Sequence, residues 1–249
     1  MDESSPSLPL SGKTVLITGG ARRIGRHMAL TAAQAGANIV VHHAHSPAEA
    51  QAVCAEARKF GVSAHAVTAD LNDFGQASSL ISAALCFGPL DIIINNAAIF
   101  EPLKPLDTSL NDWLRHLNTN LTAPFIISRT FATSLAEGKE GRIVNILDWR
   151  ALRPGPDHFP YTVSKAGLAA MTQSLAAALA PRILVNGLAL GAVLPPSDHP
   201  EASDEVLQSV PAGRWATLDE VGQALLFLLC GPAYITGEII HLDGGRHLI

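Results

Sequence analysis

Short apolar runs alternate along the chain with longer stretches in which apolar residues recur at helical spacing. The runs that predict strands are residues 13–19, 38–42, 62–70, 90–98, 141–147, 182–190 and 238–245. The stretches that predict helices are 22–36, 109–137 and 161–180, with three more segments beginning at Ser46, Asp73 and Thr217. Continuous apolar strands separated by helices are typical of a parallel sheet covered on both faces. The pattern therefore predicts an α/β protein: a doubly wound parallel sheet (Rossmann fold) with helices on both faces.

No internal repeat, low-complexity tract or linker divides this pattern, so a single domain is expected over residues 12–249. The acidic and polar residues 1–11 are predicted to form a flexible tail. Residues 193–213 are rich in proline, serine and aspartate, and we expect them to form a mobile lid. Pro124 is expected to kink the helix predicted over 109–137, because proline cannot donate the helical hydrogen bond.

Composition and charge narrow the classes of function. The chain of 249 residues is 48% hydrophobic with a net charge of −5, which suits a large core but offers no basic surface for nucleic acid or an anionic membrane. No apolar run approaches the ~18 residues of a membrane span, and the polar N-terminus is unlike a signal peptide. The three cysteines are scattered without a CxxC pair, and no metal site is predicted. We expect a cytoplasmic protein that acts on a small molecule.

A glycine-containing turn, TGGARRIG over residues 18–25, joins the first predicted strand to the first predicted helix. Gly19 is required where the backbone takes positive φ or passes close to a ligand. The helix that follows presents free N–H groups to a pyrophosphate, and Gly25 allows that helix to pack closely on the sheet. At the first strand–helix junction of an alternating chain, this turn predicts dinucleotide binding.

Tyr161 and Lys165 lie four positions apart at the start of the helix predicted over 161–180, so they share a helix face. A free tyrosine has a pKa of about 10 and exchanges protons poorly near neutrality. A neighbouring ammonium favours the phenolate, so we expect Lys165 to lower the pKa of Tyr161. Tyr161 would then give a proton to the group that receives hydride.

These motifs resemble those of the short-chain dehydrogenase/reductase family, over residues 12–247. Thr18, Gly19 and Gly25 match the family's glycine turn, and the Tyr161–Lys165 pair matches its catalytic pair. The segment 186–196 resembles the family's stretch beside the nicotinamide, with Leu190 in place of its proline. The resemblance implies a homotetramer and a cofactor site made of Gly19, Arg22, Arg23, Ile24, His43, His45, Ser46, Asp70, Leu71, Asn96, Ala97, Ala98, Tyr161, Lys165, Gly191 and Val193.

The segment that ends the second predicted strand favours NADP(H) over NAD(H). An NAD site needs an acidic residue there to accept a hydrogen bond from the ribose 2′-hydroxyl. The sequence VVHHAHS over 40–46 has no acid before Glu49. A basic Arg22 and the polar residues His43, His45 and Ser46 are expected to surround a 2′-phosphate instead.

Three departures from the general family pattern resemble its pteridine reductases. Arg23 replaces the middle glycine of the turn, Phe100 follows NNAA where those enzymes stack the pterin ring, and Asp148 replaces the usual serine thirteen residues before the tyrosine. An ionised carboxylate only accepts hydrogen bonds, so Asp148 suits a substrate with N–H groups, and a flat heteroaromatic ring suits stacking on Phe100. The resemblance implies catalytic roles for Asp148, Tyr161, Lys165 and Asn120, with Asn120 holding a relay water, and substrate contacts from Arg23, Phe100, Asp148 and Tyr161.

The sequence thus predicts an NADPH-dependent oxidoreductase that reduces a pterin-like C=N bond by hydride transfer. One alternative is a 3-oxoacyl-(acyl-carrier-protein) reductase or another carbonyl reductase, which the same fold supports, although Asp148 argues against it. A second alternative is a non-catalytic NADP-binding sensor, which would have no need of the Tyr161–Lys165 pair. The physiological substrate and the direction of the reaction are not apparent from the sequence.

Overall fold

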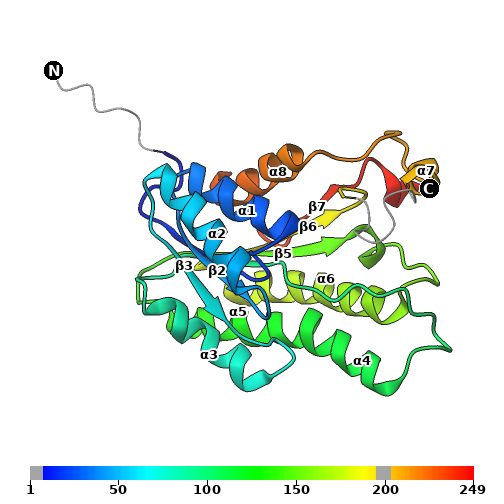
Figure 1. Cartoon of the computed structure of the whole chain (residues 1–249), viewed down its shortest axis with the longest axis horizontal. Helices are drawn as coiled ribbons and strands as arrows, with labels where there is room; N and C mark the ends of the chain where they lie inside the picture. The colour runs from blue at the N-terminus through cyan, green and yellow to red at the C-terminus, as the bar shows by residue number, and fades with distance from the viewer. Residues whose placement is uncertain (1–7, 195–202) are drawn as a thin grey trace.

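The computed structural model describes residues 8–194 and 203–249, and its centre is a parallel sheet of seven strands (Figure 1). The strands are β1 (Thr14–Ile17), β2 (Asn38–His43), β3 (Ala64–Thr68), β4 (Ile92–Asn95), β5 (Gly141–Asp148), β6 (Ile183–Leu190) and β7 (Ile239–Leu242). Their order across the sheet is β3-β2-β1-β4-β5-β6-β7, and every neighbouring pair is parallel. The predicted doubly wound sheet is confirmed.

Helices cover both faces of this sheet (Figure 1). One face carries α1 (Arg23–Gln34), α2 (Pro47–Ala57) and α8 (Leu218–Cys230), and the other carries α3 (Phe74–Leu85), α4 (Leu110–Leu117), α5 (Ala123–Ser134) and α6 (Phe159–Leu179). Ile92 and Ile94 of β4 are buried in the core beneath α1 and α8, whereas Ile93 is buried in the core beneath α3 and α5. Because successive side chains of a strand point to opposite faces, this two-sided burial explains the continuous apolar runs.

The strand order reverses beside β1, which pairs with β2 on one side and β4 on the other. In doubly wound sheets the crevice for ligands opens at such a point, beyond the carboxyl ends of the strands. The turn after β1 and the asparagine pair that ends β4 both lie at this edge. The topology therefore brings together two motifs that are about 75 residues apart in the sequence.

The helix predicted over 109–137 is divided in two. Residues Asn118–Thr122 form a π-helical turn (η2) between α4 and α5, in which the N–H of Ala123 donates to the carbonyl of Asn118. Pro124 has no N–H to donate and its ring clashes with the carbonyl four residues earlier. The expected distortion is therefore present just before Pro124, as a widened turn that contains Asn120. Such π turns are frequent at functional sites.

The ends of the predicted domain differ from expectation. Residues 8–11, assigned to a flexible tail from the sequence, include a buried Leu10 whose N–H donates to the carbonyl of Ala35 at 2.9 Å. The lid predicted over 193–213 falls partly on 195–202, outside the described residues. Its described part contains the short helix α7 (Ser203–Gln208) and a buried Val210. None of the described helices combines the length and the apolar character needed to cross a membrane.

Gly25, in the first turn of α1, has no space for a side chain. A Cβ at this position would lie 2.1 Å from the carbonyl oxygen of Gly19. We expect Gly25→Ala to lower the free energy of unfolding by about 1–3 kcal/mol, because the glycine turn would have to move. Thermal unfolding measures this effect.

Gly75, in the first turn of α3, is the matched control for Gly25. A Cβ there would meet only the side chain of Asp73, at 3.2 Å. Alanine at Gly75 is expected to keep or raise the melting temperature, because glycine costs about 0.5–1 kcal/mol relative to alanine within a helix. Equal melting temperatures for the two variants would contradict the close packing inferred at Gly25.

Candidate active site

The glycine turn is held to the end of β4 by hydrogen bonds from Asn96. The Asn96 side chain donates to the carbonyl oxygens of Thr18 and Gly19, at 2.9 and 3.2 Å. The Thr18 hydroxyl in turn accepts from the N–H groups of Asn96 and Ala97, at 2.9 and 3.0 Å. Gly19 takes a φ of +63°, and Arg23 takes a φ of +51°, a left-handed conformation that favours glycine. These hydrogen bonds fix the glycine turn against the end of β4.

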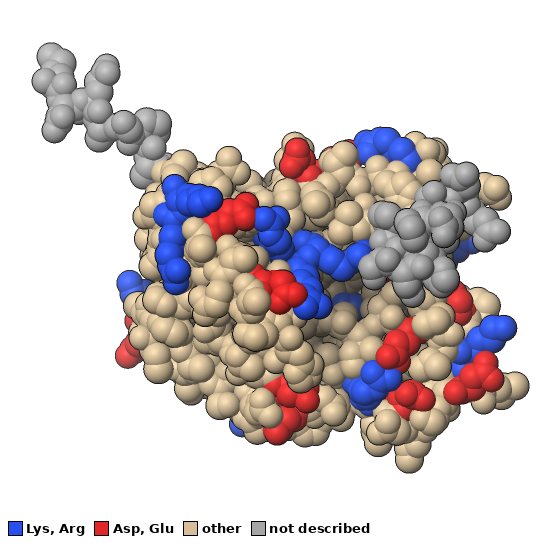
Figure 2. All heavy atoms as spheres, viewed as in Figure 1, with Lys and Arg blue, Asp and Glu red and all other residues tan. Residues whose placement is uncertain are grey.

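Two cavities adjoin this turn and share Arg23, Ile24, Asn96 and Ala98 as lining residues. The turn cavity, of about 700 Å³, lies over the glycine turn. It is lined by ten of the predicted cofactor residues: Gly19, Arg22, Arg23, Ile24, His45, Asp70, Leu71, Asn96, Ala97 and Ala98. The tyrosine cavity, of about 510 Å³, contains Tyr161, Lys165, Asp148, Phe100, Gly191 and Val193. Figure 2 shows a hollow in the middle of the face that it draws, with Lys and Arg side chains along its border.

The N-terminus of α1 lies at the turn cavity, and no side chain of the described residues caps its first N–H groups. Arg22, the residue before the helix, makes no side-chain capping bond, and the first turn contains no acidic residue. The first N–H groups of a helix lack partners within the helix and carry its positive dipole end. This end of the cavity therefore suits a phosphate group.

Only two of the four residues predicted to surround a 2′-phosphate line the turn cavity. Arg22 and His45 line the turn cavity, where Arg22 is ion-paired with Glu49. His43 is buried, and its ring bonds the hydroxyl of Thr68 at 3.1 Å instead of reaching the cavity. Ser46 stands before the first residue of α2 and is not among the lining residues. The structure thus leaves Arg22 and His45 as the residues of this group placed for an anion.

His42, which the sequence analysis did not select, also shapes the turn. Its Nδ1 accepts from the N–H of Gly19 at 3.1 Å, and its Nε2 donates to the carbonyl of Ala69 at 2.9 Å. Burial lowers the pKa of His42 to about 4. The ring therefore stays neutral near pH 7, in the tautomer that both hydrogen bonds require.

In the tyrosine cavity, Tyr161 and Asp148 are in direct contact. The Tyr161 hydroxyl donates to Oδ2 of Asp148 at 3.2 Å, while Oδ1 accepts from the N–H of Arg150 at 2.9 Å. Lys165, one helical turn after Tyr161, donates from Nζ to the carbonyl of Ile146 at 2.6 Å. That Nζ lies 5.7 Å from the centre of the Tyr161 ring. Three of the four predicted catalytic side chains therefore meet at the end of β5.

The expected lowering of the Tyr161 pKa is wrong. Burial raises the pKa of the Tyr161 phenol well above its usual range, and the adjacent Asp148 carboxylate raises it further. Burial likewise raises the pKa of Asp148, against the opposing effect of the Arg150 N–H, and lowers that of Lys165 to about 8. The Lys165 ammonium bonds a backbone carbonyl rather than the phenol. Tyr161 is accordingly held in its protonated form, the form that donates a proton.

Asn120 lines neither cavity, and its side chain forms hydrogen bonds with the backbone of Ile99. It is almost completely buried, and its Oδ1 accepts from the N–H of Ile99 at 2.8 Å. Its Nδ2 donates to the carbonyl of Ile99 and to the hydroxyl of Ser164, both at 3.0 Å. Ser164 donates to the Tyr161 carbonyl at 2.6 Å, so Asn120 connects Ile99 to the helix that carries the tyrosine. The predicted role with a relay water stays a prediction.

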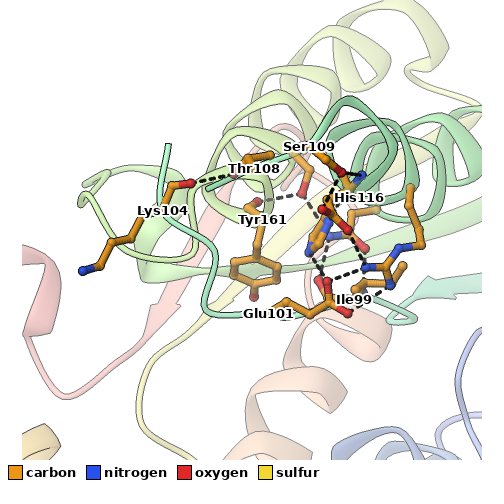
Figure 3. A network of polar contacts seen from close by, with 11 residues as sticks. Ile99, Glu101, Lys104, Thr108, Ser109, His116 and Tyr161 are labelled. Carbon is orange, nitrogen blue, oxygen red and sulfur yellow. Dashed lines mark hydrogen bonds and ion pairs between the residues drawn. The ribbon is translucent and has the colours of Figure 1, made fainter. Parts of the chain in front are cut away.

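Phe100 lies beside the Tyr161 ring, and the residues before and after it in the sequence are both fixed by hydrogen bonds. Ile99 before it is fixed by Asn120, and Glu101 after it pairs with both terminal nitrogens of Arg115, one at 3.0 Å (Figure 3). The Phe100 ring is 4.7 Å from the Tyr161 ring, edge to face, and 4.0 Å from the parallel ring of His158. About half of Phe100 is exposed. Phe100 is therefore a firmly placed aromatic surface next to the phenol.

The aromatic and basic lining residues of the tyrosine cavity that were not selected from the sequence are Trp149, Arg150, His158, Trp215 and Arg246. Trp149 and Arg150 directly follow Asp148, so their position after the strand end was a usable signal. His158 precedes α6 in a left-handed conformation, at φ +51°. Trp215 and Arg246 reach the cavity from chain segments far from Asp148, and no local motif marks them.

Comparisons with known proteins agree with this geometry. A family model described as Enoyl-(Acyl carrier protein) reductase matches residues 19–247. A 3-oxoacyl-[acyl-carrier-protein] reductase FabG of Aquifex aeolicus is 36% identical, and the match covers 96% of this chain and 98% of that protein. Among solved structures, FolM alternative dihydrofolate reductase 1 of Brucella canis, complexed with NADP, is 34% identical with a TM-score of 0.89 over 98% of this chain and 97% of its own.

A short-chain dehydrogenase/reductase of Serratia marcescens is 32% identical, with a TM-score of 0.89 over 96% of this chain and 99% of its own. These similarities extend over nearly the whole length of each protein, including helix α6, which carries Tyr161 and Lys165. The predicted cofactor, NADP(H), is the one bound in the Brucella canis structure. The chain belongs to the short-chain dehydrogenase/reductase family of oxidoreductases.

Proposed function

We propose that this protein is an NADPH-dependent reductase of pterin-like C=N bonds. The observation that carries the proposal is the contact between the Tyr161 hydroxyl and the Asp148 carboxylate, at 3.2 Å, beside the half-exposed ring of Phe100. A carboxylate at this place can accept from the ring N–H and amino groups of a pterin. An aromatic face next to it gives the flat ring a stacking partner. The similarity to FolM alternative dihydrofolate reductase 1 of Brucella canis supports the same substrate class.

The residues of the turn cavity fit NADPH. Gly25 leaves no room for a side chain between α1 and the glycine turn, so the start of the helix packs directly on that turn. The uncapped N-terminus of α1 is placed for the pyrophosphate, and Arg22 and His45 are placed for the 2′-phosphate. Gly191 and Val193 line the tyrosine cavity where the nicotinamide would lie. NADPH, when bound, supplies the hydride for the substrate carbon.

The side chains of the tyrosine cavity supply the proton and the positioning. Tyr161, kept protonated by burial, donates its hydroxyl proton to the nitrogen of the reduced C=N bond. Asp148, whose pKa is raised, can then return a proton to Tyr161 across their hydrogen bond. The ammonium of Lys165, 5.7 Å from the centre of the Tyr161 ring, offsets part of the cost of the phenolate that forms in between, while burial keeps the pKa of Tyr161 high.

Reduction of a 3-oxoacyl thioester is the second candidate function. The specific observation in its favour is the 36% identity to a 3-oxoacyl-[acyl-carrier-protein] reductase over 98% of that protein. Asp148 opposes it in its ionised form, because that form cannot donate a hydrogen bond to the alkoxide that develops from a ketone, whereas a serine hydroxyl can. A non-catalytic sensor is a weaker reading, because a buried lysine beside a buried Tyr–Asp pair has a desolvation cost that nucleotide binding alone does not require.

A comparison of two substrates tests the proposed function. NADPH oxidation is measured with 7,8-dihydrobiopterin and with an acetoacetyl thioester, at equal enzyme concentration. We expect kcat/KM for the dihydropterin to exceed that for the thioester by at least about tenfold, the effect of roughly 1.4 kcal/mol in the transition state. Turnover of the thioester alone would overturn the proposal in favour of the second candidate, and no turnover of either would favour the sensor.

A homotetramer is proposed as the assembled state. Exposed apolar side chains gather on and around α4 and α5, including Leu110, Leu114 and Phe125. Large exposed apolar side chains on neighbouring helices are often covered at interfaces between subunits. The molar mass of the protein in solution decides between a monomer and a closed tetramer.

A further inference from the structure

Arg246 brings a positive charge into the tyrosine cavity from the far end of the chain. It begins the 3-10 turn Arg246–Leu248 (η5), which follows β7 and packs on the turn Trp149–Ala151 (η3). The central carbon of its guanidinium lies 4.4 Å from the centre of the Trp149 ring. Arg246 and Trp149 both line the cavity that contains Tyr161 and Asp148.

The guanidinium of Arg246 has no acidic partner among the described residues. Within 8–194 and 203–249, no carboxylate lies within ion-pair distance of it, and its buried Nε has no hydrogen-bond acceptor. Asp243, the nearest acid in the sequence, is occupied by the N–H groups of Gly245 and His247 and by the His247 ring. Arg246 thus differs from Arg150, which is paired with Asp157 at 2.7 Å.

A partly buried cation without a partner carries a desolvation cost that packing on Trp149 offsets only in part. Burial lowers the pKa of Arg246, and the positive charge of Arg150 lowers it further, against the more distant carboxylates Asp148, Asp157 and Asp243. An arginine in this setting is suited to bind an anion, because its planar fork of N–H groups matches the two oxygens of a carboxylate. The reacting pair and Arg246 share one cavity, so such an anion would belong to the substrate.

We propose that Arg246, stacked on Trp149, forms a subsite for a carboxylate carried by the substrate away from its reacting ring. The subsite determines specificity: it selects pterins with a carboxylate-bearing tail over pterins with an uncharged one. The inference rests on the proposed function for the identity of the ring, but the anion subsite itself does not depend on which ring is reduced.

Kinetics with two pterins test this subsite. KM and kcat are measured for 7,8-dihydrofolate, which carries carboxylates on its tail, and for 7,8-dihydrobiopterin, whose side chain is uncharged. We expect Arg246→Gln to raise KM for dihydrofolate at least about tenfold, the effect of losing a charge-assisted hydrogen bond. KM for dihydrobiopterin and kcat for both substrates should stay within about twofold of wild type. Equal changes for the two substrates, or no change for either, would overturn the subsite.

Arg153→Gln is the control for net charge. Arg153 lies near Trp149 in the sequence but is exposed and is not among the residues that line the cavity. The same loss of charge there should leave both KM values unchanged. Arg246→Lys, which keeps the charge without the planar fork, should retain part of the affinity for dihydrofolate and guards against a folding defect in the glutamine variant.

A binding measurement separates this inference from the proposed function. Calorimetric titration of the NADP⁺-loaded enzyme with 4-aminobenzoylglutamate, which has carboxylates but no pterin ring, should show binding to wild type and at least about tenfold weaker binding to Arg246→Gln. That result would support the subsite even if neither pterin were reduced. Absence of binding to wild type, or equal binding to both proteins, would overturn it.

Discussion

Asp148→Ser is expected to lower kcat/KM for dihydropterin reduction by roughly a hundredfold, about 2.7 kcal/mol of transition-state stabilisation. A neutral serine hydroxyl accepts more weakly from the pterin N–H groups than a carboxylate does, and it is too weak an acid to return a proton to Tyr161. The same substitution should raise the rate with an acetoacetyl thioester, because a serine hydroxyl can donate to a developing alkoxide. The ratio of the two kcat/KM values measures this exchange of specificity.

The pH dependence of the reaction adds a second readout for Asp148. Its raised pKa means that the carboxyl stays protonated to higher pH than an exposed aspartate. If protonated Asp148 resupplies Tyr161, the wild-type rate with dihydropterin is highest below that pKa and falls as the pH rises through it. Asp148→Asn, which keeps the shape and the acceptor for the Arg150 N–H, should be slow at every pH and lack this fall. An unchanged pH profile in the asparagine variant would contradict the role of Asp148.

The sequence predicted those parts of the site that depend on spacing within one element. The spacing of four positions from Tyr161 to Lys165 places both on one face of α6, and apolar strands at regular intervals predict the parallel sheet. The topology then places the glycine turn and Asn96 at one edge, because parallel strands end together. These features follow from local geometry, so a single sequence was enough to predict them.

Other features depend on three-dimensional packing that no local pattern records. His43 and Ser46 were grouped with Arg22 because they are close in sequence, but the alternation of side chains along β2 directs His43 to Thr68. Lys165 was expected to act on the phenol, whereas burial of both groups and the carbonyl of Ile146 determine its environment. Arg246 enters the cavity only because β7 pairs with β6 beside β5. Each of these depends on contacts between distant segments.

The charged groups at the end of β5 are partly buried, which opposes folding. The cavity gathers Asp148, Lys165 and several arginines in a partly dehydrated place, which costs folding free energy unless each charge finds a partner. Asp148 has the Arg150 N–H and the Tyr161 hydroxyl, and Lys165 has the Ile146 carbonyl. Groups whose pKa values are shifted in this way are concentrated at catalytic sites. This argues that the arrangement serves proton transfer rather than stability.

Tyr161→Phe is expected to lower kcat for the preferred substrate by about 10²–10⁴-fold, the usual effect of removing a general acid. Phenylalanine keeps the ring against Phe100, so the fold and the affinity for NADPH should be retained. The chain has only one other tyrosine, Tyr234, which is fully exposed, so Tyr234→Phe is the matched control and should leave kcat unchanged. Single-turnover rates with NADPH measure the chemical step directly. A Tyr161→Phe enzyme within a few fold of wild type would mean that another group delivers the proton, and the assignment of Asp148 as its source would be wrong with it.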